Sequence, residues 1–65
     1  MTTPTVRYDE SSDAAYIRFS PAPVLESEEV SEGIVLDFDA MGRIVGMEVM
    51  EATRRLAPDL LGKAA

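Results

Sequence analysis

The stretch GIVLDFDAMGRIVGMEVM, residues 33–50, decides the fold because it contains two strand patterns joined by a short turn. Residues 33–39 and 43–50 each alternate apolar and polar side chains, which is the period of a half-buried strand. The turn between them ends in Gly42, which can take the positive φ that a hairpin loop requires. Gly46 lies inside the second strand and indicates a bulge or a close backbone contact. The stretch therefore predicts an antiparallel hairpin.

The turn sequence DFDAMG also resembles part of a calcium-binding EF-hand loop. Counted from Asp37, acidic residues fall at positions 1, 3 and 12, and a glycine falls at position 6. An EF-hand loop needs a helix on each side, whereas both flanks here are strand patterns. Met41 stands at a ligand position without a side-chain oxygen, and Glu48 would lie in mid-strand, away from the turn. We therefore interpret Asp37 and Asp39 as hairpin residues, and we predict no metal site and no cofactor.

A second hairpin is predicted at the start of the chain. Residues 5–9 and 14–20 alternate in the same way, and the serines and acids of residues 10–13 between them have turn chemistry. Asp9 and Asp13 flank this turn, so we interpret them as turn-capping residues.

The acidic segment VLESEEVSEG, residues 24–33, is ambiguous, and we interpret it as an edge strand or extended segment that ends at Gly33. Pro21 and Pro23 end the strand before it, because proline cannot donate to a β-ladder. Such a segment either forms a solvated face that prevents edge-to-edge aggregation or serves as a recognition patch for a basic partner. The candidate partner-binding residues are Glu26, Glu28, Glu29 and Glu32.

The period changes after residue 50, where EATRRLAPDLLGKAA predicts a short helix over 51–57 that packs Leu56 on the sheet. Pro58 interrupts any longer helix and could begin a second turn over 58–62, but we predict residues 58–65 to be a loosely ordered tail. The predicted fold class is α+β and mostly β: an antiparallel meander of four or five strands with one short C-terminal helix. Residues 1–65 form a single small domain with a core over about 5–57.

The composition excludes several kinds of site. The 65 residues include no cysteine and no histidine, so a disulfide, a thiolate metal site and a Ser-His or Cys-His catalytic pair are all excluded within one chain. A chain of this length without a disulfide or metal is marginally stable alone, and oligomerisation is the remaining common solution. We therefore expect a homo-oligomer, with a dimer as the first choice, that buries Leu25, Val35 or Val45 from a second sheet face.

The charge distribution limits the partners. The net charge is −6, and residues 1–51 carry 11 acidic residues against three arginines. We predict no direct nucleic-acid partner, because binding a nucleic acid depends on neutralising its phosphates, whereas a basic protein would be attracted to such a surface. The sequence contains neither an apolar run of transmembrane length nor the apolar core of a signal peptide, so we expect no membrane contact and a cytoplasmic location.

Two sets of residues together resemble a known family. The first is Tyr8-Asp9, Asp13-Ala14, Tyr16-Ile17 and Phe19; the second is Gly33-Ile34, Leu36-Asp37, Asp39, Gly42, Gly46 and Glu48. In order and spacing they resemble the small bacterial and archaeal family called domain of unknown function 2283, over about residues 6–56. The family typically has a third acidic residue where this chain has Met41. The resemblance implies a compact sheet with a C-terminal helix, and a similarity to small members of toxin–antitoxin-like pairs.

Three functions remain open from the sequence. The first is an acidic protein-binding or oligomerisation module, including an antitoxin-like partner of a basic protein. The second is an enzyme with paired carboxylates, either Asp37 with Glu48 or Asp9 with Asp13. This function needs one carboxyl group whose pKa is raised by burial. The third is a small-ligand-binding homodimer in which tyrosines of the first hairpin line a cleft. We expect the first of these and no enzymatic activity.

Overall fold

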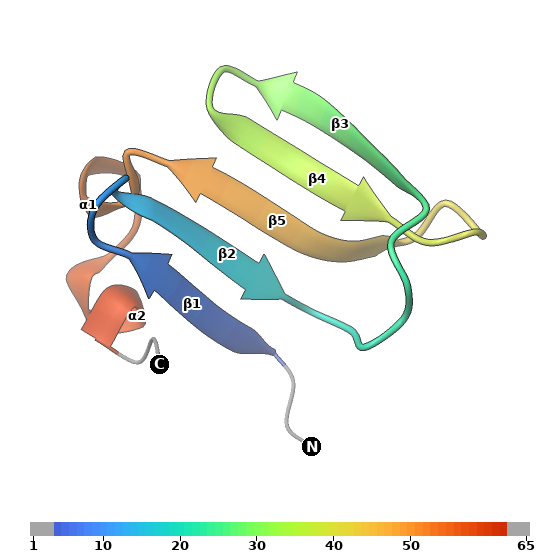
Figure 1. Cartoon of the computed structure of the whole chain (residues 1–65), viewed down its shortest axis with the longest axis horizontal. Helices are drawn as coiled ribbons and strands as arrows, with labels where there is room; N and C mark the ends of the chain where they lie inside the picture. The colour runs from blue at the N-terminus through green and yellow to red at the C-terminus, as the bar shows by residue number, and fades with distance from the viewer. Residues whose placement is uncertain (1–3, 63–65) are drawn as a thin grey trace.

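A computed structural model describes residues 4–62 as one five-stranded antiparallel sheet with two short helices (Figure 1). This architecture confirms the mostly β class and the antiparallel sheet. The strands and helices are β1 (Thr5–Asp9), β2 (Ala14–Arg18), β3 (Glu26–Ser31), β4 (Ile34–Phe38), β5 (Ile44–Met50), α1 (Ala52–Arg55) and α2 (Pro58–Gly62).

The order of the strands in the sheet is β1-β2-β5-β4-β3, so the chain does not follow the predicted meander throughout. The connection from β2 contains Pro21 and Pro23 and does not make a tight hairpin. It carries the chain to the far edge of the sheet (Figure 1). The chain then returns through β4 to β5, which lies in the centre between β2 and β4. The acidic β3 is therefore an edge strand, and all six of its residues are exposed.

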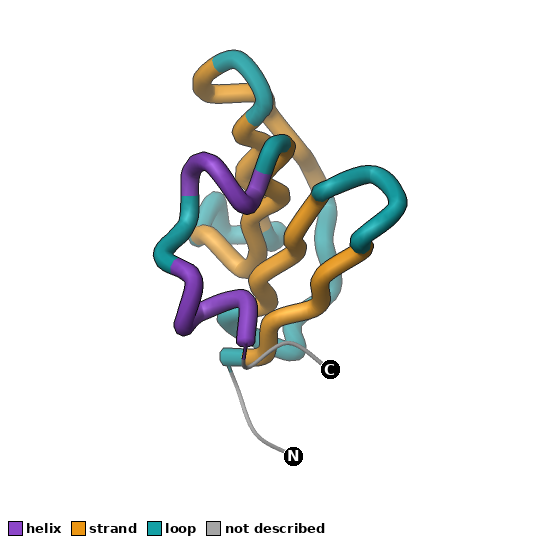
Figure 2. Tube along the Cα trace, turned by 90° about the vertical axis from the view of Figure 1, so that its left-hand side faces the viewer, coloured by secondary structure: helices purple, strands orange, loops and turns teal. Residues whose placement is uncertain are grey.

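The two faces of the sheet differ in polarity because the register aligns like with like across the central strands. Ala15 pairs with Val49 and Ile17 pairs with Met47, so apolar side chains share the face on which the helices lie, here called the helix face. Figure 2 shows both helices on one side of the sheet. The opposite face, here called the open face, carries polar side chains such as Tyr16, which pairs with the exposed Glu48.

The buried core is small, and its largest fully buried side chains are two valines, each 2% exposed. One of them is Val45, so the expectation that Val45 is left exposed was wrong. It lies near the start of the central strand on the helix face, where its neighbours cover it. Leu25 is 66% exposed and Val35 is half-buried. The buried apolar residues of the described chain are Ala15, Ile17, Val45, Val49 and Ala52.

The C-terminal segment forms two short helices where one was predicted. α1 ends before Pro58, and this proline then begins α2, a position that suits its fixed φ and missing N–H. Residues 58–62 are therefore helical and not a loose tail, while residues 63–65 lie outside the described part of the chain. Neither described helix is long and apolar enough to span a membrane.

The helices cover only part of the helix face. α2 packs against β1 at the opposite edge of the sheet from β3. In Figure 2 the β3–β4 hairpin extends beyond both helices. All five residues of β4 are half-buried, in contrast to the buried positions of β2 and β5. Half of the apolar face is therefore less well covered than the other half.

We predict that Val49→Ala lowers the free energy of unfolding by about 2 kcal/mol, because it removes two buried methylene-sized groups and leaves a cavity. Val30→Ala is the matched control, since Val30 is 49% exposed on the edge strand β3. Its expected effect is below about 0.5 kcal/mol. Urea denaturation followed by far-ultraviolet circular dichroism measures both, and equal losses would show that the core is not where the structure places it.

Candidate functional site

A chain of hydrogen bonds crosses the open face from β2 to β3. The Tyr16 hydroxyl donates to Asp37 Oδ2 at 2.7 Å, and the Ser27 hydroxyl donates to Asp37 Oδ1 at 2.6 Å. Arg18 Nη1 donates to the Tyr16 hydroxyl oxygen at 3.2 Å. The network therefore joins strands that are not neighbours, because β5 lies between Tyr16 and Asp37.

Gly46 makes this crossing possible. It lies on β5 opposite both Arg18 and Asp37, and the Tyr16 hydroxyl lies directly over it. A Cβ at position 46 would lie 2.3 Å from the Tyr16 hydroxyl oxygen, a separation that atoms do not adopt. Burial raises the pKa of Tyr16, and its hydrogen bond to Asp37 raises it further. The close backbone contact predicted for Gly46 is thus a contact with a tyrosine side chain.

Arg18 extends the network into the connection between β2 and β3. Its Nε donates to the Ser20 carbonyl oxygen at 2.6 Å, and its Nη2 donates to the carbonyl oxygen of Ala22. The guanidinium group therefore satisfies backbone acceptors in the proline-containing connection that leads to the far edge of the sheet. This arrangement favours a structural role for Arg18.

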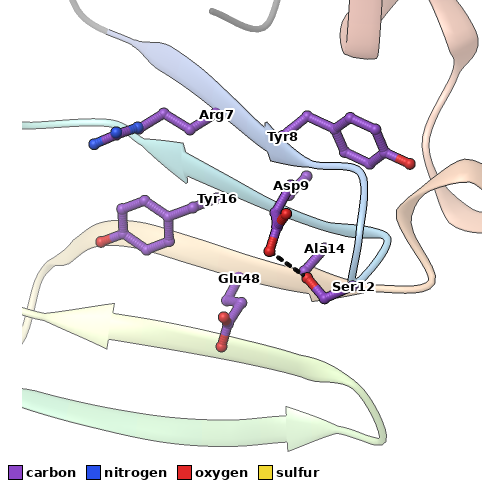
Figure 3. A pocket seen from close by; sticks show the side chains of 8 residues that line it. Arg7, Tyr8, Asp9, Ser12, Ala14, Tyr16 and Glu48 are labelled. Carbon is purple, nitrogen blue, oxygen red and sulfur yellow. Dashed lines mark hydrogen bonds between the residues drawn. The ribbon is translucent and has the colours of Figure 1, made fainter.

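A shallow hollow of about 450 Å³ lies beside this network on the side of the β1–β2 turn (Figure 3). Figure 3 shows Tyr16, Asp9 and Glu48 on three sides of the hollow, with Ala14 beside Ser12 at the end next to the turn. The two tyrosines of the first hairpin do not point the same way, since Tyr8 bonds to Asp13 and Tyr16 bonds to Asp37. The hollow is lined by Arg7, Tyr8, Asp9, Ser12, Ala14, Ala15, Tyr16 and Glu48.

Asp13 connects the β1–β2 turn to the first helix. Its backbone carbonyl accepts from the Ala52 N–H at 2.9 Å. Its side chain accepts from the Thr53 N–H at 3.1 Å and from the Thr53 hydroxyl at 2.8 Å. The residue before the helix, Glu51, has a φ of 54° and caps none of these groups with its own side chain. Asp13 therefore caps α1 from 40 residues away, a role that sequence spacing does not reveal.

The same carboxylate also accepts the Tyr8 hydroxyl at 2.8 Å. This hydrogen bond and then those from Thr53 lower the pKa of Asp13 below its ordinary value of 3.8. Asp9 is similar, because the hydroxyls of Ser12 and Ser11 lower its pKa. A catalytic acid needs a raised pKa, so hydrogen bonding moves this pair of carboxylates in the opposite direction.

The other candidate pair, Asp37 with Glu48, lies on the open face. Asp37 pairs with Gly46 and Glu48 pairs with Val35, so the two acids are diagonal neighbours on adjacent strands. Both oxygens of Asp37 already accept hydrogen bonds from side chains. Glu48 is exposed.

The β4–β5 turn contains the DFDAMG sequence, and its two acids have different partners. Asp39 Oδ1 accepts from the backbone N–H groups of Met41, at 2.8 Å, and Arg43, at 2.9 Å. These contacts lower the pKa of Asp39, the bond from Arg43 most strongly. Gly42 takes a φ of 78° in this turn. Asp37 instead faces the sheet network, and no group of three acids that could hold a metal ion occurs among residues 4–62.

The four glutamates of β3 and the β3–β4 turn lie in different environments. Glu26 pairs with Phe38 and Glu28 pairs with Leu36, so both lie beside apolar residues of the helix face. Glu29 lies on the other face, where its carboxylate accepts the Gly33 N–H at 3.1 Å. The fourth is Glu32, in the β3–β4 turn.

That turn is also held by a residue from α1. Arg55 Nη1 donates to the Glu32 carbonyl oxygen at 2.8 Å. Gly33 has a φ of 81°, and a Cβ there would lie 3.3 Å from the Arg55 guanidinium. Arg55 therefore covers the corner of the helix face next to the turn.

A group of exposed apolar residues lies at the opposite end of the sheet from α1. The Phe19 N–H donates to the Val45 carbonyl and the Leu25 N–H donates to the Phe38 carbonyl, while Phe38 pairs with Ile44. These contacts place the ends of four strands side by side, with the β4–β5 turn beyond them (Figure 1). We call the exposed residues here the far-end patch: Phe19 (43% exposed), Val24 (39%), Leu25 (66%), Met41 (74%) and Ile44 (49%).

We predict that Gly46→Ala lowers the free energy of unfolding by about 1–3 kcal/mol, because the new Cβ displaces the Tyr16 hydroxyl from Asp37. Tyr16→Phe should cost about 1 kcal/mol. The double variant should lose less than the sum of the two, since the atom that Gly46→Ala displaces is already absent. Urea denaturation of the four proteins measures this coupling, and strictly additive losses would contradict the contact.

We also predict that hydrogen bonding to ionised Asp13 contributes to the pH dependence of stability. Because its pKa is lowered on folding, its contribution is present above its ordinary pKa of 3.8 and is lost as the pH falls through the lower folded value. Asp13→Asn should therefore reduce the slope of unfolding free energy against pH below about pH 4. Thermal denaturation between pH 2 and 6 tests this, with Glu10→Gln in the same turn as control, and an unchanged slope would contradict it.

The comparisons with known proteins bear on the family and not on a function. The family model described as "Protein of unknown function (DUF2283)" matches residues 5–52, which include all five strands. No curated protein and no solved structure matches the chain. The match covers most of the chain, including the Tyr16–Asp37 network, Gly46 and the Asp13 carboxylate. The chain therefore belongs to the DUF2283 family of proteins of unknown function.

Proposed function

We propose that this chain is a protein-binding module that pairs with a second copy of itself through the far-end patch. The observation that carries the proposal is the concentration of exposed apolar side chains at one end of a protein whose own core is very small. Leu25, Ile44 and Met41 are each about half exposed or more. Exposed apolar residues that occur singly need no explanation, but several at adjacent strand ends favour an interaction site.

The size of the protein supports association. The described chain buries only small and medium side chains fully, with Val45 and Val49 the largest. Domains of this length usually gain stability from disulfides, metals or oligomerisation, and this sequence has no cysteine or histidine for the first two. Burial of the far-end patch against another protein would add apolar area that the monomer leaves in water.

The charges around the patch fit a second copy. Arg43 has a 75% exposed side chain in the β4–β5 turn, and the exposed Glu26 begins the neighbouring strand β3. The same end of the molecule therefore presents both signs of charge. A two-fold arrangement can place Arg43 of one protomer near Glu26 of its partner, because an isologous interface brings each surface against itself.

Of the other functions considered, the antitoxin-like role and the small-ligand site remain predictions. The hollow beside Tyr16 is the place where a small ligand would bind, and its lining combines an arginine with two carboxylates. Paired-carboxylate catalysis is not favoured by the lowered pKa values of Asp9 and Asp13.

We predict a dimer whose dissociation constant rises at least about tenfold in Ile44→Ser, because loss of a buried aliphatic side chain costs about 1.5–3 kcal/mol. Val30→Ser is a matched control, since Val30 and Ile44 are both β-branched and both 49% exposed, but Val30 lies at the other end of the sheet. Sedimentation equilibrium measures the constants. A monomer of 7.1 kDa at all concentrations, or equal effects of the two variants, would contradict the proposal.

A further inference from the structure

The helix face has a second apolar surface that the far-end patch does not include. It consists of Leu36 and Phe38 on β4 and Met47 on the central strand, here called the uncovered strip. Leu36 pairs with Met47, and all three side chains are half-buried. α2 packs against β1 at the other edge of the sheet, and Arg55 of α1 closes the strip at the β3–β4 turn. Figure 2 shows the β3–β4 hairpin beyond the helices.

The dimensions of the uncovered strip match a helix. Three adjacent strands, β3 to β5, span about 10 Å between the outer two, which is the diameter of a helix with its side chains. The five residues of β4 extend about 17 Å along the sheet, the length of about 11 helical residues. The chain's own helices occupy the other half of this face, so a third helix would complete an existing layer.

The charges beside the strip select the kind of helix. Glu26 pairs with Phe38 and Glu28 pairs with Leu36, so their side chains share the face of the strip and flank its outer edge. Both glutamates are exposed, and neither carboxylate has a hydrogen-bond or ion-pair partner among residues 4–62. A second copy of this chain carries 12 acidic residues against six basic ones, so it offers less positive charge to this edge than a basic helix does. A helix with an apolar stripe and basic residues beside it would instead pair with the two carboxylates.

We propose that the uncovered strip, with Glu26 and Glu28 as its rim, is the docking site for an amphipathic basic helix of a partner protein. The strip provides apolar contact for side chains spaced i, i+4 and i+7 on that helix. The two glutamates fix its lateral position and favour lysine or arginine on its flank. The apolar side chains of this site differ from those of the far-end patch, and Glu26 is the residue that the two proposed surfaces share.

The test uses a fluorescently labelled 15-residue helical peptide with leucines on one face and lysines on both flanks. A peptide of the same composition, scrambled so that no apolar face forms, is the control for charge. Fluorescence anisotropy should show saturable binding of the first peptide and at least about fivefold weaker binding of the second. Equal binding of the two would overturn the proposal, because it would reduce the interaction to charge attraction.

Two matched pairs of variants locate the site. Glu26→Gln with Glu28→Gln should weaken binding about fivefold, whereas Glu29→Gln with Glu32→Gln removes the same charge away from the strip and should change it less than twofold. Leu36→Ala should weaken binding about tenfold and Val35→Ala should not, since these adjacent half-buried residues face opposite sides of β4. Equal effects within either pair would overturn the proposal.

A second copy on the strip is the competing outcome, and sedimentation equilibrium of the same variants separates it. If Leu36→Ala dissociates a dimer that Ile44→Ser leaves intact, a second copy occupies the strip and the basic-helix proposal falls. If Ile44→Ser dissociates the dimer and still binds the peptide, both proposals stand. If no dimer forms at all, the proposed self-association fails while peptide binding still decides the docking site.

Discussion

The capping of α1 by Asp13 is the interaction on which the arrangement of the molecule depends. The carbonyl and carboxylate of one turn residue accept three hydrogen bonds from Ala52 and Thr53, at the start of a helix of only four residues. A helix so short is not stable without tertiary contacts. By fixing where α1 begins, Asp13 sets the path that leads to α2 against β1, and Ala52, the first residue of α1, is fully buried.

That placement determines what the rest of the surface can do. Because α2 packs against β1 at the opposite edge of the sheet, Leu36 and Phe38 are only half-buried. Hydrogen bonds hold the β3–β4 hairpin in place. On the open face, Tyr16 and Ser27 donate to Asp37 above Gly46, and Arg55 donates to the Glu32 carbonyl at the turn. Hydrogen bonds thus hold the half of the sheet that is less deeply buried. The apolar side of this half is the surface that we propose as a docking site.

The local patterns of the sequence were sufficient for four strands and for the β1–β2 and β4–β5 hairpins, whereas the pattern of residues 24–33 fitted either an edge strand or an extended segment. Alternation over residues 33–50, together with Gly42 in the turn, predicted β4, β5 and the connection between them. Strand order was not predictable in the same way, because it depends on long-range pairing of β2 with β5. Pro21 and Pro23 indicated only that β2 ends. The second helix was missed because Pro58 is equally compatible with a helix start and with a loose tail.

The candidate site was predictable only in part, since its contacts join residues that are far apart in the chain. Gly46 signalled a close contact, but the sequence did not identify Tyr16 as the neighbour, 30 positions before it. The neighbouring turn residues led to the prediction that Asp13 caps its own turn, whereas its carboxylate accepts a hydrogen bond from the Thr53 hydroxyl. The four glutamates of the acidic segment look equivalent in sequence. Register alone separates Glu26 and Glu28, beside the apolar strip, from Glu29 on the other face.

The claim that the helix face is only half covered can be measured directly with a soluble nitroxide and methyl NMR spectroscopy. In the Ile44→Ser protein, which removes self-association at the far-end patch, the nitroxide should broaden the Leu36 methyl signals strongly. It should leave the methyl signals of Val49 and Ile17 nearly unchanged, because these residues are 2% and 7% exposed beneath the helical layer. Equal broadening of all three residues, or protection of Leu36 as complete as that of Val49, would contradict the account.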